Sequence, residues 1–141
     1  MAETPTAFLG TWQLVPGESK FEFDAPPRAA TTRVMPKPDG LFFSVDWVDP
    51  KDKKGHVEHV LKYDEPTLVL GTEVTLKVLN EKTIETIVHK EGRLVSKTRR
   101  VILADGSMEL TQTGKLPDGR EVKNVSRYRK DVNINPGPMR V

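Results

Sequence analysis

Apolar and polar side chains alternate with period two along most of this chain. The alternation is clearest over residues 41–48, 57–63, 74–78 and 84–89. Turn residues such as Asp, Gly, Asn and Pro separate these segments at regular intervals. This pattern is typical of half-buried antiparallel strands, and no window shows the apolar spacing of an amphipathic helix longer than about two turns. The sequence therefore predicts an all-β fold.

Regular short strands joined by tight turns favour an antiparallel up-and-down meander β-barrel of eight to ten strands. Strands are expected near 9–15, 30–36, 41–49, 55–63, 67–71, 74–80, 83–90, 93–104, 107–116 and 120–130, with an uncertain break at Gly71-Thr72. We expect residues 1–141 to form one domain, in which the barrel covers about 8–130. Residues 16–28 are expected to form a long loop over one end, and residues 131–141 a mobile tail.

Two adjacent turns near the C-terminus set the register of three strands. Asp105-Gly106 predicts a two-residue loop that pairs Arg99 with Gln112. Pro117-Asp118-Gly119 predicts a three-residue loop that pairs Gln112 with Asn124. In this register Arg99, Gln112 and Asn124 lie side by side and face the barrel interior, while Arg100 and Arg127 face solvent.

A buried arginine is costly unless it is paired, so this polar row is the main functional clue. Either the three side chains hydrogen-bond one another and ordered water, or they hold a ligand that carries a carboxylate, phosphate or carbonyl oxygen. Tyr128 faces the same interior and offers a hydroxyl. An apolar lining that includes Phe43, Trp47 and Leu110 would surround the ligand, although the same side chains would also fill an empty core.

The bulk composition narrows the function further. The chain has 36% hydrophobic and 30% charged residues, a net charge of +2 and no cysteine. It has no basic block, which argues against nucleic acid, and no apolar run near the roughly 20 residues of a membrane helix. Because the N-terminus lacks signal-peptide features, we expect a cytoplasmic protein, or a secreted or periplasmic one if a signal peptide has been removed.

The start of the first strand carries the motif Phe8-Leu9-Gly10-Thr11-Trp12. It resembles the Gly-x-Trp signature of the calycins, the superfamily of lipocalins and fatty-acid-binding proteins, and its continuation to Phe21 is similar to small bacterial lipocalin-like proteins. The resemblance implies a ligand-binding barrel closed near Trp12. Tyr128 matches the tyrosine of the inward Arg-x-Tyr of fatty-acid-binding proteins, but Ser126 replaces the arginine. The segment between the first two strands is also too short for the two helices of those proteins.

His59 lies on the apolar face of its strand, between Val57 and Leu61. It is expected to be either a hydrogen-bonded core histidine or a ligand contact or general base. His56 points to the opposite face of the same strand, so the two histidines cannot chelate one metal ion. We expect no metal site and no cofactor.

The favoured function is reversible binding of a small, largely apolar ligand with a polar or anionic head, held by Arg99, Gln112, Asn124 and Tyr128. One alternative is a barrel enzyme, an isomerase or lyase, that uses His59 or Tyr128 for proton transfer with Arg99 as oxyanion stabiliser. Another is a filled barrel without a ligand. The chain contains no nucleophile elbow, phosphate loop or dinucleotide fingerprint, so enzyme activity is the less favoured interpretation.

Overall fold

The computed structural model describes residues 4–23 and 25–131, so all of the expected tail except Asp131 lies outside the described residues. A short 3-10 helix, Thr6–Phe8, precedes eleven strands. The strands are β1 (Gly10–Leu14), β2 (Lys20–Phe21), β3 (Ala29–Lys37), β4 (Gly40–Val48), β5 (Lys54–Lys62), β6 (Thr67–Val69), β7 (Thr72–Asn80), β8 (Thr83–Lys90), β9 (Arg93–Ile102), β10 (Met108–Lys115) and β11 (Glu121–Lys130). No helix among the described residues is long and apolar enough to cross a membrane.

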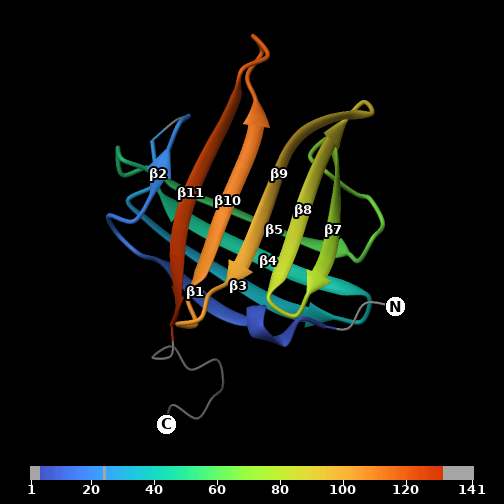
Figure 1. The fold of residues 1–141 in the computed structure, drawn as a ribbon, viewed down its shortest axis with the longest axis horizontal. Helices are drawn as coiled ribbons and strands as arrows, with labels where there is room; N and C mark the ends of the chain where they lie inside the picture. The colour runs from blue at the N-terminus through green and yellow to red at the C-terminus, as the bar shows by residue number, and fades with distance from the viewer. Residues whose placement is uncertain (1–3, 24, 132–141) are drawn as a thin grey trace.

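All these strands belong to one antiparallel sheet, in which ten follow the order β5-β4-β3-β1-β11-β10-β9-β8-β7-β6 and β2 pairs with β11. The sheet folds over so that β1 and β3–β5 cross behind β7–β11 (Figure 1). The two ends of the sheet meet where Tyr63, just after β5, bridges Leu76 of β7, and the Asp64 amide donates to the Leu76 carbonyl over 2.8 Å. The fold is therefore the antiparallel, nearly closed meander barrel that the alternation predicts.

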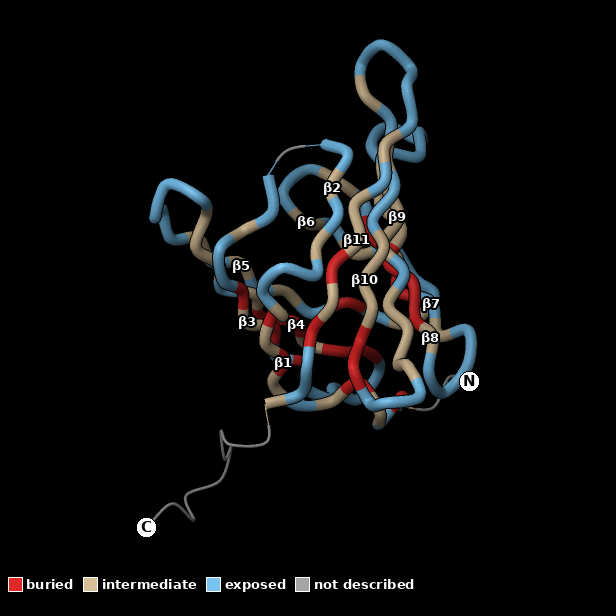
Figure 2. Tube along the Cα trace, turned by 60° about the vertical axis from the view of Figure 1, so that its left-hand side comes forward, coloured by how far each residue is buried: buried red, intermediate tan, exposed pale blue. Residues whose placement is uncertain are grey.

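The hydrophobic core is concentrated at one end of the barrel. Phe8, Trp12, Leu76 and Met108 are almost completely shielded there, and the Trp12 indole donates to the Phe8 carbonyl over 2.9 Å. Figure 2 shows the buried segments in the lower part of the molecule and exposed loops at the upper end. The lower end is thus closed by packing, with Trp12 in the position that the Gly-x-Trp resemblance implies.

The β10–β11 hairpin has the predicted register. Gln112 pairs with Asn124 and Glu109 with Arg127. The Leu116 amide donates to the Arg120 carbonyl over 2.9 Å, which closes a three-residue loop, and Gly119 has the left-handed φ of 89° that this loop requires. The prediction for this loop is confirmed.

The predicted β9–β10 register is wrong by one residue. Met108 pairs with Ile102 rather than Leu103, and Leu110 pairs with Arg100 rather than Val101. The cause is a three-residue loop, residues 104–106, closed by the Leu103 amide on the Ser107 carbonyl at 2.8 Å. Since side chains alternate along a strand, this shift reverses every side chain of β9.

The segment expected to be a loop, residues 16–28, contains the short strand β2, which pairs with β11. Phe21 lies opposite Asn124 and Lys20 opposite Val125. The uncertain break at Gly71-Thr72 is a real turn, because Leu70 and Gly71 both have positive φ, 48° and 83°, between β6 and β7.

Candidate functional site

Arg100 points into the barrel from β9. Its Nη1 donates to the Thr86 hydroxyl over 3.1 Å, and its guanidinium lies 5.0 Å from the centroid of the Phe43 ring. Its Nε is shielded from solvent and has no hydrogen-bond partner among the described residues. Burial lowers the pKa of Arg100 to about 10, which still leaves the group charged at neutral pH. The interior therefore contains a cation whose hydrogen-bonding capacity is only partly used.

His59 and Tyr128 lie around this cation. Burial, and secondarily the charge of Arg100, lower the pKa of His59, so its imidazole is neutral at pH 7. Its ring is 6.0 Å from that of Phe43, and its Nδ1 is buried without a partner among the described residues. Burial raises the pKa of Tyr128, whose hydroxyl is hydrogen-bonded to Thr32. These are the side chains that the ligand-binding interpretation and the proton-transfer alternative name, with Arg100 in the place of Arg99.

Arg99 lies on the outer face, which corrects its predicted position. Its Nε and Nη2 donate to one carboxylate oxygen of Glu85, over 2.8 and 2.5 Å. The Arg99 side chain is 53% exposed, whereas that of Glu85 is 7% exposed. Arg99 is also paired with Thr111 instead of Gln112. The expected row of Arg99, Gln112 and Asn124 does not form.

Gln112 and Asn124 remain neighbours, but near the open end of the barrel. Gln112 is exposed, and both residues line a hollow of about 340 Å³ together with Phe21 and Phe23. The Asn124 side-chain oxygen accepts the amides of Glu22 and Phe23 over 2.9 and 3.1 Å, and its nitrogen donates to the Phe23 carbonyl over 3.0 Å. Asn124 thus fastens the segment after β2 across the rim.

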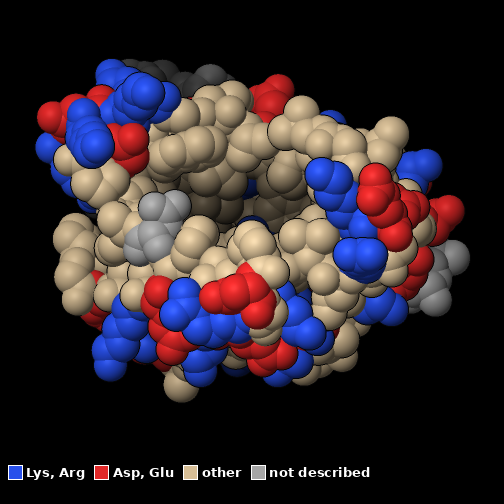
Figure 3. All heavy atoms as spheres, turned by 90° about the horizontal axis from the view of Figure 1, so that it is seen from above, with Lys and Arg blue, Asp and Glu red and all other residues tan. Residues whose placement is uncertain are grey.

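The other residues expected to line the interior pack into the core cluster. Phe43 is buried, and Trp47 and Leu110 are partly buried against the same core cluster. Seen from the end where β10 and β11 project, the molecule is hollowed between its two layers, with Lys or Arg atoms visible deep inside (Figure 3). A hollow with basic side chains at its floor therefore opens at this end.

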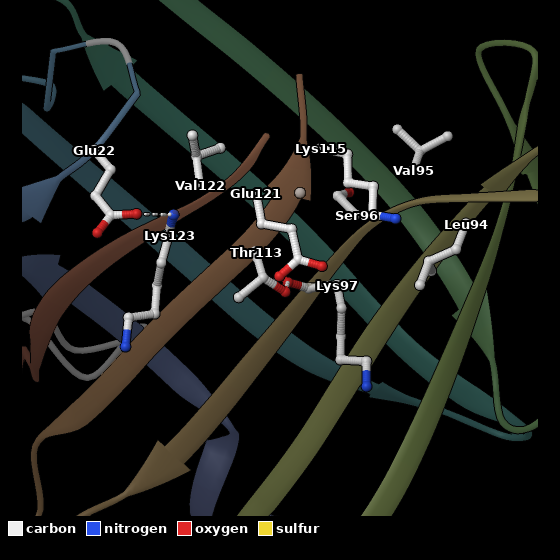
Figure 4. Close-up of a pocket in the computed structure, with 11 residues that line it drawn as sticks. Glu22, Leu94, Val95, Ser96, Lys97, Thr113, Lys115, Glu121, Val122 and Lys123 are labelled. Carbon is white, nitrogen blue, oxygen red and sulfur yellow. Dashed lines mark hydrogen bonds between the residues drawn. The ribbon is translucent and has the colours of Figure 1, made fainter. Parts of the chain in front are cut away.

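A second hollow, of about 490 Å³, lies at the tips of β9–β11. Leu94, Val95 and Val122 lie toward the tips, while Lys97 and Lys123 extend away from them (Figure 4). None of the residues around Arg100 lines this hollow, which lies at the strand ends beside the hollow lined by Gln112 and Asn124. Within the described residues, no group of three or more His, Cys, Asp or Glu side chains could hold a metal ion.

Arg100 is the interior polar residue that the sequence reasoning missed. Glu85 could have shown from the sequence that Arg99 faces outward. In the register of the structure Glu85 lies directly opposite Arg99, which gives an opposite-charge pair on the outer face of β8 and β9. Testing the β8–β9 hairpin in the same way as the C-terminal hairpins would have favoured Arg100 as the inward arginine.

No protein-family model and no curated protein matches this chain. Solved structures do match over most of its length. A Schistosoma mansoni fatty acid binding protein in complex with arachidonic acid has a TM-score of 0.67 at 13% identity, over 92% of this chain and 99% of that one.

Two further structures are similar. A mutant of the fluorescent protein UnaG has a TM-score of 0.61 at 17% identity, over 87% of this chain and 95% of that one. As-p18, an extracellular fatty acid binding protein, has a TM-score of 0.57 at 14% identity, over 92% and 100%. The chain therefore has the barrel fold of the fatty-acid-binding proteins.

Proposed function

We propose that this barrel binds one small, largely apolar ligand with an anionic head, and that Arg100 holds the head. The observation that carries the proposal is the Arg100 guanidinium inside the barrel. Among the described residues it has a neutral hydroxyl, that of Thr86, as its hydrogen-bond acceptor and no carboxylate partner. A buried cation of this kind is stabilised by an anion that accepts its remaining N–H groups.

The surroundings of Arg100 favour an amphipathic ligand. Phe43 and Leu110 lie beside Arg100, and Trp47 packs against the same core cluster. Apolar side chains of this kind supply most of the affinity for such molecules. His59 is neutral and adds no second charge, so one anionic group balances the site. Two of the similar structures are named as fatty acid binding proteins, one of them in complex with arachidonic acid. A long-chain carboxylic acid is accordingly the ligand class we propose.

Three further proposals rest on the sequence alone. We propose that the protein is related to the small bacterial lipocalin-like proteins, that it is cytoplasmic, and that it has no nucleic-acid partner. The roles of Gln112 and Asn124 are revised: we propose that they shape the rim through which the ligand enters, rather than hold its head.

The test is a titration with an environment-sensitive fluorescent fatty acid. Wild type is expected to take up the probe, and Arg100→Met to bind it roughly 10- to 100-fold more weakly, the equivalent of about 1.5–3 kcal/mol for hydrogen bonds to a charged group. Arg99→Met is the matched control, because it makes the same chemical change on the outer face and should leave the affinity unchanged.

Two results would contradict the proposal. One is a wild-type protein that takes up no probe, which would indicate a filled barrel. The other is an Arg100→Met variant that binds as tightly as wild type, which would remove Arg100 as the anchor. Far-ultraviolet circular dichroism of both variants shows whether they are folded at the assay temperature.

A further inference from the structure

Tyr63 carries a buried hydroxyl that the protein itself does not satisfy. The residue follows β5 on the same face as His59 and Leu61, and its ring packs against the core cluster. Its hydroxyl oxygen is shielded from solvent and has no hydrogen-bond partner among the described residues. Leaving a hydroxyl in this state lowers the stability of the fold, so phenylalanine would be the better residue if only packing mattered.

The other tyrosine of the chain shows that this is not a general property of the barrel. Tyr128 is also buried, but its hydroxyl is hydrogen-bonded to Thr32. The fold is therefore able to provide a partner for a tyrosine hydroxyl within its wall. At Tyr63 no such partner is present among the described residues.

Tyr63 lies apart from the head-group site. It bridges Leu76, and Leu76 pairs with Thr86, the residue that Arg100 contacts. Two interstrand spacings, about 10 Å, therefore separate the backbones of Tyr63 and Thr86, and four residues of strand, about 13 Å, separate Tyr63 from His59. A ligand that extends from Arg100 by about two interstrand spacings would reach the strand position of Tyr63 with its apolar part.

We propose that Tyr63 is a specificity-determining residue that hydrogen-bonds a second polar group on the ligand. The ligand class is then a long-chain acid with a hydroxyl or keto group along its chain, rather than an unsubstituted acid. This inference rests on the proposed function, since it takes Arg100 as the anchor of the acid. Sites built to hydrogen-bond a substrate oxygen discriminate against analogues that lack it, because their own polar group is then left unpaired.

The experiment compares an unsubstituted long-chain acid with a set of isomers that each carry one hydroxyl at a different carbon, by displacement of the fluorescent fatty acid. On wild type, one isomer is expected to bind about 3- to 10-fold more tightly than the unsubstituted acid, the usual net effect of one hydrogen bond. In Tyr63→Phe this advantage is expected to disappear, while the affinity for the unsubstituted acid stays the same.

Tyr128→Phe is the matched control, because it removes a hydroxyl that the protein already satisfies. It should change the affinity for both kinds of acid by the same factor. The melting temperature of ligand-free Tyr63→Phe should equal or exceed that of wild type, since no protein hydrogen bond is lost. A lower melting temperature would assign the hydroxyl a structural role and overturn the inference.

The binding data separate the two proposals. If the unsubstituted acid binds but no hydroxy isomer is preferred, or if Tyr63→Phe keeps the preference, the inference about Tyr63 is wrong and the function of the barrel stands. If none of the acids displaces the probe, the proposed function is wrong and the inference is rejected with it.

Discussion

Two consecutive arginines on β9 differ in their hydrogen-bond partners. Arg99, on the outer face, donates twice to the Glu85 carboxylate, and the pair is complete within the wall of the barrel. Arg100, on the inner face, contacts the Thr86 hydroxyl and the Phe43 ring and has a buried Nε without a partner. Two arginines one residue apart thus differ: the outer one has a carboxylate partner, and the inner one has an N–H group without an acceptor.

Two histidines of β5 repeat this contrast. His56 is exposed on the outer face, with Asp46 2.6 Å from its Nδ1 and Glu58 3.1 Å from its Nε2. His59 points inward, and its Nδ1 is buried without a partner among the described residues. In both comparisons the outer group has a protein partner and the inner group has unused hydrogen-bonding capacity.

The contrast indicates that the outer polar groups stabilise the sheet and the inner polar groups serve binding. Outer charges are paired across strands, where they support the sheet. Inner polar groups lower the stability of the empty barrel, and such residues are found in proteins where binding requires them. Substitutions on the two faces should therefore affect stability and binding in opposite ways.

The largest effect on stability is expected at the outer arginine. Arg99→Met leaves the Glu85 carboxylate, 7% exposed, without its partner and should lower the free energy of unfolding by about 1–3 kcal/mol. Arg100→Met replaces an incompletely paired buried cation with an apolar side chain and should leave that free energy unchanged or raise it. Urea denaturation of ligand-free protein measures both values.

A double variant sharpens this test. Adding Glu85→Gln to Arg99→Met removes the unpaired carboxylate and should recover part of the lost stability, whereas Glu85→Gln should not improve Arg100→Met. If Arg100→Met is the more destabilised of the two single variants, the inner arginine has a structural role and the contrast between the faces fails.

Much of the fold follows from local patterns in the sequence. Period-two alternation and turn residues predicted the barrel and nearly all of its strands, because each strand of an antiparallel sheet records its buried face in its own residues. β2 was missed, since its two residues are too few to show a period. It is held by long-range bonds to β11, which no local pattern reports.

The site was predicted less well, and one loop explains the error. Asp105-Gly106 and Asp118-Gly119 both end three-residue loops, with Gly106 and Gly119 at φ of 87° and 89°. Pro117 marked the longer loop at the second position, whereas Ala104 gave no such mark at the first. Ser107 completes the first loop, donating its amide and hydroxyl to Asp105 over 2.9 and 2.6 Å. One extra loop residue exchanged Arg99 for Arg100 at the centre of the site.

Asn124 is an inner polar residue that does have partners, so it should behave like the outer groups. Asn124→Ala removes its hydrogen bonds to Glu22 and Phe23 and should lower the free energy of unfolding by about 1 kcal/mol. Hydrogen exchange should show lost protection at the Phe23 amide, whereas the Glu22 amide keeps the Lys123 carbonyl as an acceptor at 3.2 Å. Gln112→Ala, on the neighbouring strand, is the control and should leave both amides protected. Unchanged protection in Asn124→Ala would show that β2 is held by other contacts.

The smallest effects are the titrations of the two histidines, which should move in opposite directions from the ordinary value of 6.5. Hydrogen bonds to Asp46 and then Glu58 raise the pKa of His56, whereas burial and then Arg100 lower the pKa of His59. NMR titration of the imidazole protons should therefore show His59 losing its proton at lower pH than His56. Titration in the reverse order would contradict the contrast between the two faces.

The same shifts set the pH dependence of stability. The His56 contribution is fully present below pH 6.5 and is lost as pH rises through its raised pKa, since the folded state then holds the extra proton. The His59 contribution is fully present above pH 6.5 and is lost as pH falls through its lowered pKa. Arg100→Met should move the His59 midpoint part of the way back toward 6.5, because burial remains, and should leave the His56 midpoint unchanged. A shift of both midpoints would mean that the charge of Arg100 acts through the wall rather than within the barrel.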